Sequence, residues 1–563
     1  MKRFLITTTA NKKSLGLSLL TISISMVATA VVQLVYWQRT DPPFSTDTFR
    51  YLYMAKSFLD GDLRHAIHYH YPPLFPLFTA PFLGLTQTPE MGGRIACLVI
   101  AMLTALPVYF LTEKIFNRTV AALATLFLPF IFFHLPLIVD AQPLLGLLLY
   151  AAIAVGLISL RSKRPELSFL TGIMFGLDSL AKMEAQAFFV LYLAILFVHL
   201  IVTRHPWRRT LGRVALLGLG YLLVLSPYLG AFYRDTGRVS INPKLAPLFY
   251  GHNEPDWGRA CYSLRHDEHG EFTLEQRVVA EGDRRPFQFS LASYLFANLP
   301  RLAPIYLDRL GFTIKNIIPA YLWYLSPPSG LLAGLLILIG LVRPGWTRAQ
   351  FWQESYLISF GLLTIFSVPL FIPQMRFFTP LIPLLVILLA RGVEQLSLRL
   401  TALLGKLFSG LKAGRAQTVI VAILAILSLL PNLLLLYRYP REKEYHQFVA
   451  DRRLPADWVR GHLEPGRKIL STWDNMPFWY LIGIDLDRDL AIPQGSLEDL
   501  IRYAREQNVE YLIYESGKLE TRYPDLDPLL DPRFQHPALE RVYAQVSPDG
   551  RYSVIYRIKP VSG

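Results

Sequence analysis

Long apolar runs without charged residues alternate with short polar segments through most of residues 1–437. The first run, 15–36, is long enough to cross the hydrocarbon core of a bilayer as a helix. Several later runs are shorter, so we expect them to extend into neighbouring aromatic or proline-containing residues. The pattern predicts about eleven membrane-spanning helices. The later ones are expected at 95–111, 120–137, 144–160, 167–180, 187–202, 214–231, 331–342, 356–372, 377–389 and 419–436.

The first apolar run follows a basic N-terminal flank, which is also how a secretory signal peptide begins. The triplet Ala28-Thr29-Ala30 resembles a signal-peptidase site, but the apolar run continues past it. We therefore predict an uncleaved first helix, with a cleaved signal as the alternative. The basic residues of the flank are Lys2, Arg3, Lys12 and Lys13.

Composition and charge agree with this pattern. The chain has 563 residues, of which 52% are hydrophobic and 17% charged, with a formal net charge of +14. The positive charge is concentrated in short loops on one side of the predicted spans, where Lys and Arg mark the cytoplasmic face. It is therefore a topology signal, and no nucleic acid is expected as a partner. We predict a bacterial inner (plasma) membrane protein with a cytoplasmic N-terminus.

The same topology places two large loops, 37–91 and 232–328, and the C-terminal region outside the membrane. Within the second loop, 287–325 is amphipathic and is expected to lie on or dip into the membrane. We predict a transmembrane domain over 1–437 and an outward-facing α/β domain over 438–563, because helix and strand patterns alternate there. Its elements are expected at 456–463, 468–472, 496–507, 509–514, 542–546 and 552–558, the last two as a hairpin around Pro548-Asp549-Gly550.

The first outer loop holds the main candidate for chemistry. Asp47 precedes Phe49 and Tyr51 in a pattern that predicts a short helix with the carboxylate at its N-terminal end. A helix N-terminus also favours a capping Asp, Ser or Thr, so a purely structural role for Asp47 is the alternative.

Three histidines, His65, His68 and His70, lie later in this loop at spacings that can bring imidazoles together. They are weak candidates for a metal, because no carboxylate or cysteine of standard metal-site spacing completes the set. The alternative is that they bind water or a phosphate. No other cofactor is indicated, and Cys97 and Cys261 are not expected to share a depth or form a disulfide.

Ionisable residues also lie near the predicted outer ends of several spans, where they are costly and become functional candidates. Asp178 and Lys182 are four residues apart, so they could pair on one helical face or bind a ligand. Together these residues could line one outward-facing cavity, with an acid to take a proton and cations to hold an anion. The set is Asp140, Asp178, Lys182, Glu184 and Arg376.

Five short motifs occur in order along the chain: Asp47 with Tyr51-Leu52-Tyr53-Met54-Ala55, then His70-Tyr71-Pro72-Pro73-Leu74, Asp140-Ala141-Gln142-Pro143-Leu144-Leu145, Gly176-Leu177-Asp178-Ser179-Leu180-Ala181-Lys182 and Met375-Arg376-Phe377-Phe378-Thr379-Pro380-Leu381-Ile382-Pro383. Together they resemble the GT-C glycosyltransferases, especially the bacterial set similar to protein O-mannosyltransferases and the lipid A aminoarabinose transferase. Thr48 stands where the eukaryotic mannosyltransferases have a second acid, which argues against close kinship with that branch.

The resemblance implies a GT-C-like helical fold and transfer of a sugar from a polyprenyl-phosphate donor to a lipid, glycan or protein acceptor outside the membrane. Asp47 would be the general base of an inverting reaction. Lys182, Arg376 and His70 would bind the donor phosphate. Asp140, Tyr51 and Tyr71 would orient the substrate, and membrane lipid would surround the helices.

Two other functions fit a polytopic chain with buried charges. A lipid-linked saccharide transporter or flippase would be expected to show internally repeated halves, and no such repeat is visible in the sequence. An O-antigen ligase or polymerase would centre on the second outer loop instead of Asp47, at residues such as Arg259, His266 or His269. A non-catalytic scaffold would tolerate substitution at either place.

Overall fold

The protein was analysed as a computed structural model. It describes residues 9–40, 46–67, 71–131, 139–162, 164–203, 206–237, 239, 241, 242, 245, 249, 262–266, 272–276, 291–325, 330–342, 347–371, 373–407, 413–438, 443–471, 478–485, 488–493, 496–516, 524–546 and 552–560. The chain divides into two compact units, which we describe separately. The first comprises Met1–Pro42, Tyr51–Arg234 and Ala303–Arg441, and the second Pro43–Arg50, Asp235–Leu302 and Glu442–Gly563.

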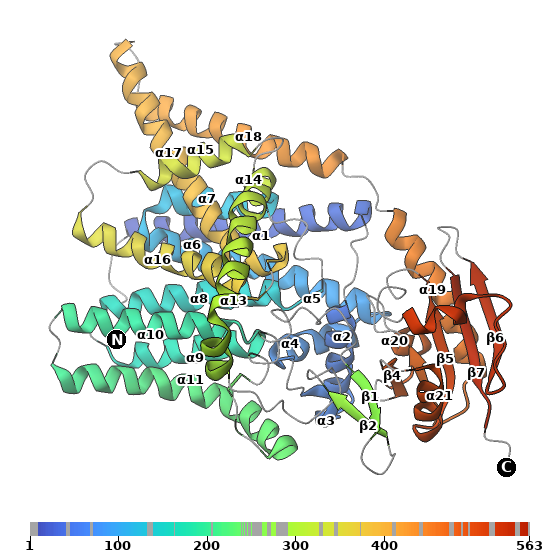
Figure 1. Cartoon of the computed structure of the whole chain (residues 1–563). Coiled ribbons are helices and arrows are strands. Elements are labelled where there is room, and N and C mark those ends of the chain that lie inside the picture. The colour runs from blue at the N-terminus through green and yellow to red at the C-terminus, as the bar shows by residue number, and fades with distance from the viewer. Residues whose placement is uncertain are drawn as a thin grey trace. The chain divides into compact units, whose positions relative to one another are not determined.

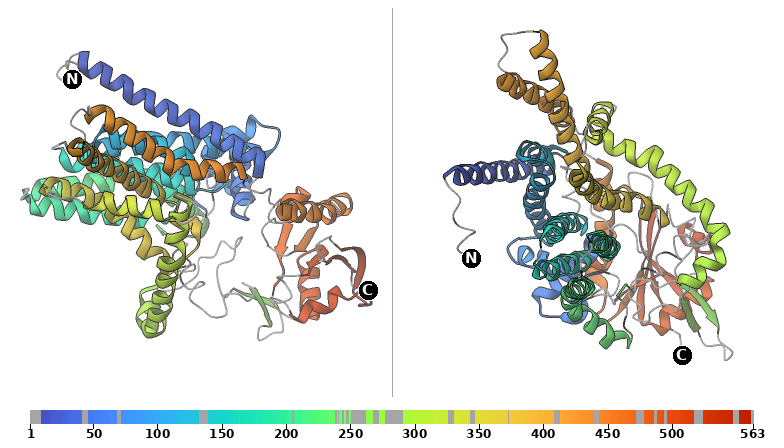
Figure 2. Two further views of the ribbon diagram at one scale, coloured as in Figure 1. Left: turned by 90° about the horizontal axis from the view of Figure 1, so that it is seen from above. Right: turned by 90° about the vertical axis from the view of Figure 1, so that its left-hand side faces the viewer.

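The first unit is a bundle of apolar helices, most of which run roughly parallel or antiparallel to one another (Figures 1 and 2). The helices α2 (Thr46–Leu59) and α13 (Leu291–Phe312) are divided between the two units, and the last two residues of α11 (Trp207–Thr236) also belong to the second. The bundle consists of α1 (Thr9–Thr40), α3 (Leu63–Ala66), α4 (Leu74–Gly84), α5 (Pro89–Leu103), α6 (Ala105–Ile115), α7 (Arg118–Ile131), α8 (Gln142–Arg161), α9 (Glu166–Ala181), α10 (Ala185–Val202), α11 (Trp207–Thr236), η3 (Thr313–Ile317), α14 (Ile318–Leu325), α15 (Leu331–Leu341), α16 (Arg348–Ser367), η4 (Val368–Leu370), η5 (Met375–Phe378), α17 (Leu381–Leu407) and α18 (Ala413–Arg438).

Every predicted span overlaps a helix of this bundle. Within the described residues, 7 helices are long and apolar enough to cross a membrane, and three shorter apolar helices accompany them. The helix α1 continues through Ala28-Thr29-Ala30 without a break. The late span predicted from residue 377 begins instead at Leu381, because Met375–Phe378 forms a short 3-10 helix ahead of it.

Glycines allow some of these helices to approach very closely. A Cβ atom on Gly220 of α11 would overlap the carbonyl oxygen of Phe169 in α9. A Cβ on Gly340 of α15 would lie 2.5 Å from the carbonyl oxygen of Leu388 in α17. Small residues at helix contacts are the usual means of close packing in membranes, because they let backbones meet. These contacts hold α9 against α11 and α15 against α17.

The second unit contains a five-stranded mixed sheet in the order β4-β3-β5-β7-β6. Strands β4, β3 and β5 are parallel to one another, and β7 runs antiparallel to both β5 and β6. Its C-terminal elements are α19 (Lys443–His462), β3 (Lys468–Ser471), α20 (Phe478–Ile482), β4 (Asp489–Ala491), α21 (Leu497–Glu506), β5 (Val509–Glu515), η7 (Pro524–Leu530), β6 (Leu539–Val546) and β7 (Tyr552–Ile558).

The predicted α/β pattern of the C-terminal region is confirmed. Ser496 caps α21, since its hydroxyl oxygen accepts from the Asp499 N–H at 3.2 Å, and β6 pairs with β7 as the expected hairpin. Pro548-Asp549-Gly550 lies outside the described residues. The sequence did not predict α20, β4 or the antiparallel pair β1 (Tyr262–His266) and β2 (Phe272–Gln276).

Candidate functional site

Asp140 occupies a turn just before α8 and is only 3% exposed. Its Oδ1 accepts a hydrogen bond from the backbone N–H of Gln142 at 3.2 Å, which fixes the carboxylate beside the helix N-terminus. Pro143 is the second residue of α8. Proline suits this position because the first N–H groups of a helix have no acceptor within the helix, so no hydrogen bond is lost. The local sequence therefore holds one buried acid at the end of an apolar helix.

Two cations from distant parts of the chain face this carboxylate. Lys182 Nζ lies 3.7 Å from Asp140 Oδ1, and Arg376 Nη1 lies 3.8 Å from Asp140 Oδ2. Both distances exceed ordinary charge-assisted hydrogen bonds, so the pairing is electrostatic and loose. With two positive groups and one negative group, the cluster has an excess of positive charge and can attract an anion.

Phe377 lies close to both cations. Its ring centroid is 5.2 Å from Lys182 Nζ and 5.0 Å from the guanidinium carbon of Arg376. A ring face attracts a cation at this range, so Phe377 helps to keep both groups near one another. Phe377 belongs to a motif that the sequence revealed, but no role was predicted for it. A single aromatic residue gives no periodic signal that would reveal contact with Lys182.

The prediction that Asp178 could pair with Lys182 on one helical face is wrong. The helix α9 ends at Ala181, and Lys182 has an extended backbone with φ −155° and ψ 131°, which turns its side chain away from the helical row. Asp178 is fully buried, and neither of its carboxyl oxygens has a hydrogen-bond partner in the structure as described. Lys182 therefore faces Asp140, and Asp178 is not part of this salt-bridged cluster.

Asp47 lies in the first turn of α2, as the sequence predicted, and its side chain is half-buried. It belongs to the second unit, as does the C-terminal domain. Tyr51 and Tyr71 are each 3% exposed and meet edge to face, with ring centroids 5.3 Å apart. Both tyrosines therefore pack in the interior of the first unit.

His65 pairs with a neighbouring carboxylate. Its Nδ1 lies 2.5 Å from Oδ2 of Asp62, the residue that caps α3, and the hydrogen bond from His65 lowers the pKa of Asp62. His68 and His70 lie outside the described residues. Among the residues that are described, no group of three or more His, Cys, Asp or Glu side chains could hold a metal ion.

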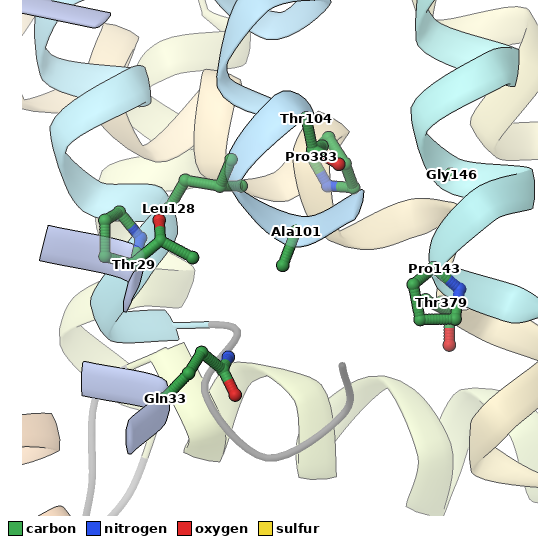
Figure 3. A pocket seen from close by; sticks show the side chains of 10 residues that line it. Thr29, Gln33, Ala101, Thr104, Leu128, Pro143, Gly146, Thr379 and Pro383 are labelled. Atoms are coloured by element: carbon green, nitrogen blue, oxygen red, sulfur yellow. The ribbon is translucent and has the colours of Figure 1, made fainter. Parts of the chain in front are cut away.

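A small cavity lies inside the bundle, and some of its lining residues are close in sequence to Asp140 and Arg376. Its walls include Thr29 and Gln33 of α1 on one side and Pro143 and Thr379 on another (Figure 3). Pro143 and Thr379 each follow a residue of the cluster by three positions, after Asp140 and Arg376. The cavity volume is about 20 Å³, which is room for roughly one water molecule. It is too small to hold a lipid chain or a sugar.

Comparisons with known proteins show which folds the chain is similar to. A family model described as dolichyl-phosphate-mannose-protein mannosyltransferase matches residues 70–230. The archaeal oligosaccharyltransferase AglB from Archaeoglobus fulgidus, solved with an inhibitory peptide and a dolichol-phosphate, superposes with a TM-score of 0.54 at 12% identity, over 94% of this chain and 74% of AglB. No curated protein sequence matches the chain.

ArnT from Cupriavidus metallidurans is similar over nearly its whole length. The structure bound to undecaprenyl phosphate gives a TM-score of 0.53 at 15% identity, covering 96% of this chain and 98% of ArnT. Its apo state gives 0.53 at 14% identity, over 97% and 98%. The chain is a helical membrane protein with the fold of the GT-C glycosyltransferases, as the resemblance in its sequence predicted.

Proposed function

We propose that the protein is an inverting glycosyltransferase that moves a sugar from a polyprenyl-phosphate donor to a hydroxyl acceptor at the outer face of the membrane. The observation that carries this proposal is the cluster in which buried Lys182 and partly exposed Arg376 share the buried Asp140. A donor of this kind leaves a phosphate behind, and positive groups stabilise that developing charge. The cluster lies at the ends of apolar helices, where a lipid-linked phosphate could reach it while its tail stays in the bilayer.

The reaction needs one base and one anion site. In the proposed step, Asp47 takes the proton of the acceptor hydroxyl while that oxygen forms a bond to the anomeric carbon. The bond between the anomeric carbon and the phosphate oxygen breaks, and its electron pair leaves with the polyprenyl phosphate. Lys182 and Arg376 neutralise the phosphate, and Asp140 keeps the two cations together until the donor binds.

Two of the similar structures hold lipid phosphates, and this supports the choice of donor. AglB was solved with a dolichol-phosphate and ArnT with undecaprenyl phosphate. The acceptor is a lipid, a glycan or a protein, and the sugar is a hexose or a pentose. We further propose that the C-terminal domain faces outward, with the N-terminus in the cytoplasm.

The anion site is tested by removing each charge in the purified chain reconstituted into liposomes. Lys182→Met and Arg376→Met should each raise the KM for a polyprenyl-phosphate sugar by about 10- to 100-fold, because a hydrogen bond to a charged group contributes roughly 1.5–3 kcal/mol. Lys315→Met is the matched control, since Lys315 is exposed in η3. Unchanged KM and kcat in both variants would mean that the cluster serves only the fold.

The same assay distinguishes the other functions. Movement of the lipid-linked sugar across the vesicle without transfer would support a transporter. Loss of transfer in His266→Ala, with activity kept in Asp47→Asn, would support a ligase centred on the second outer loop.

A further inference from the structure

The candidate base is tied to the C-terminal domain by an aromatic contact. Phe49 lies two residues after Asp47 and is fully buried. Its ring centroid is 4.5 Å from that of Tyr480, and the two rings are inclined by 50°. Both residues belong to the second unit, so the first turn of α2 packs on α20.

The short helix α20 is fixed by several independent contacts. The carboxylate of Asp489 accepts a hydrogen bond from the backbone N–H of Trp479 at 2.9 Å. The guanidinium of Arg452 lies 5.5 Å from the ring centroid of Phe478, and Arg460 Nε donates to the carbonyl oxygen of Ile482 at 3.0 Å. A helix of five residues has little stability of its own, so these contacts determine its position.

Arg452 links α20 to the centre of the sheet. It is 4% exposed and forms an ion pair with Glu515, the last residue of β5. The hydroxyl of Ser553 in β7 donates to the other carboxylate oxygen of Glu515 at 3.4 Å. Tyr480 is thus presented from a helix that the sheet holds in place.

The helical geometry of α2 then determines where Asp47 points. Successive residues in an α-helix are about 100° apart, so positions separated by two lie on roughly opposite faces. With Phe49 buried against Tyr480, the side chain of Asp47 is turned to the other side of α2, and the residue is half-buried.

We propose that Tyr480 is a positioning residue that holds the candidate general base, Asp47, through its ring contact with Phe49. This inference rests on the proposed function. It makes the C-terminal domain part of the catalytic apparatus, since a displacement of about 1 Å in a reacting group can reduce a rate by about 100-fold.

The test combines hydrogen exchange with kinetics in the full reconstituted chain. Tyr480→Ala should accelerate amide exchange in residues 46–52 and reduce kcat by about tenfold or more, with the donor KM within about twofold of native. Tyr480→Phe keeps the ring and should restore both. Tyr543→Ala is the control, because it also removes a tyrosine ring from the C-terminal domain, but from strand β6 and not from α20. Retained protection of β5 shows that the domain is still folded.

Unchanged exchange over residues 46–52 in Tyr480→Ala would overturn the positioning role by itself. Faster exchange with native kcat would also overturn it, because the contact would then be structural only. If the native chain transfers no sugar at all, the proposed function fails and the positioning role fails with it.

Discussion

The buried acid of the C-terminal domain gives a prediction about pH. Asp489 is 1% exposed; its carboxylate accepts from the Ser471 hydroxyl at 2.6 Å and from the Trp479 N–H at 2.9 Å. Burial raises the pKa of Asp489 to about 7, although these two hydrogen bonds and the nearby Arg452 oppose the shift. The ordinary pKa is 3.8, so the folded domain binds this proton more tightly than the unfolded chain does.

The sign of the effect on stability follows from linkage. A raised folded-state pKa gives stability that is fully present below pH 4 and is lost as the pH rises toward 7. At about 1.4 kcal/mol per pH unit, the free energy of unfolding falls by about 3 kcal/mol between pH 5 and pH 8. Asp489→Asn removes the titration, and its amide can donate to Ser471 while its oxygen accepts from Trp479.

The assay is thermal unfolding of the full chain in detergent at pH 5 and pH 8. Unfolding of the C-terminal domain is monitored by amide exchange or by proteolysis. The native domain should melt several degrees lower at pH 8, whereas Asp489→Asn should change much less. Asp527→Asn is the control, because Asp527 is exposed in the same domain and its substitution should leave the native pH dependence in place. If native and Asp489→Asn lose stability equally with pH, the argument from burial is wrong.

The remaining predictions concern helix packing in the bundle. Gly220→Ala should destabilise the protein by about 1–3 kcal/mol, because its Cβ would overlap a backbone carbonyl of α9, whereas Gly218→Ala, two residues away on α11 with nothing within 4 Å, should be neutral or slightly stabilising. Gly392→Ala should destabilise α17 against Leu336 of α15, with Gly405→Ala on the same helix as control. Thermal unfolding in detergent measures all four; equal effects within each pair would contradict the packing.

The helical bundle was predictable because a bilayer demands long apolar segments. Each span except 167–180, which contains Asp178, was visible as a run without Asp, Glu, Lys or Arg, and the helix that begins beside Asp47 followed from its amphipathic pattern. The C-terminal strands β5 and β7 were equally visible, because each is a short run rich in β-branched and aromatic residues. These features are local, and their physical cause lies in neighbouring residues.

The geometry of the candidate site was only partly predictable. Lys182 was identified as a candidate, but its partner Asp140 was not. The helix α9 ends at Ala181, so the backbone of Lys182 is extended and its side chain lies near Asp140. The contact between Phe49 and Tyr480 joins residues more than four hundred positions apart and leaves no local trace. The strand β4 has only three residues and begins with a buried acid, so the apolar pattern of a strand is missing.

The most direct test of the proposed function is sugar transfer by the native chain and by Asp47→Asn in liposomes that contain polyprenyl-phosphate sugars. The control is Asp60→Asn, because Asp60 is an exposed acid that follows the same helix. Both variants must insert and melt as the native chain does. Loss of a general base costs about 10²- to 10⁴-fold in rate, so Asp47→Asn should reduce kcat by that range and Asp60→Asn should not. Full activity in Asp47→Asn would contradict the assignment and leave Asp47 as the first-turn acid of α2.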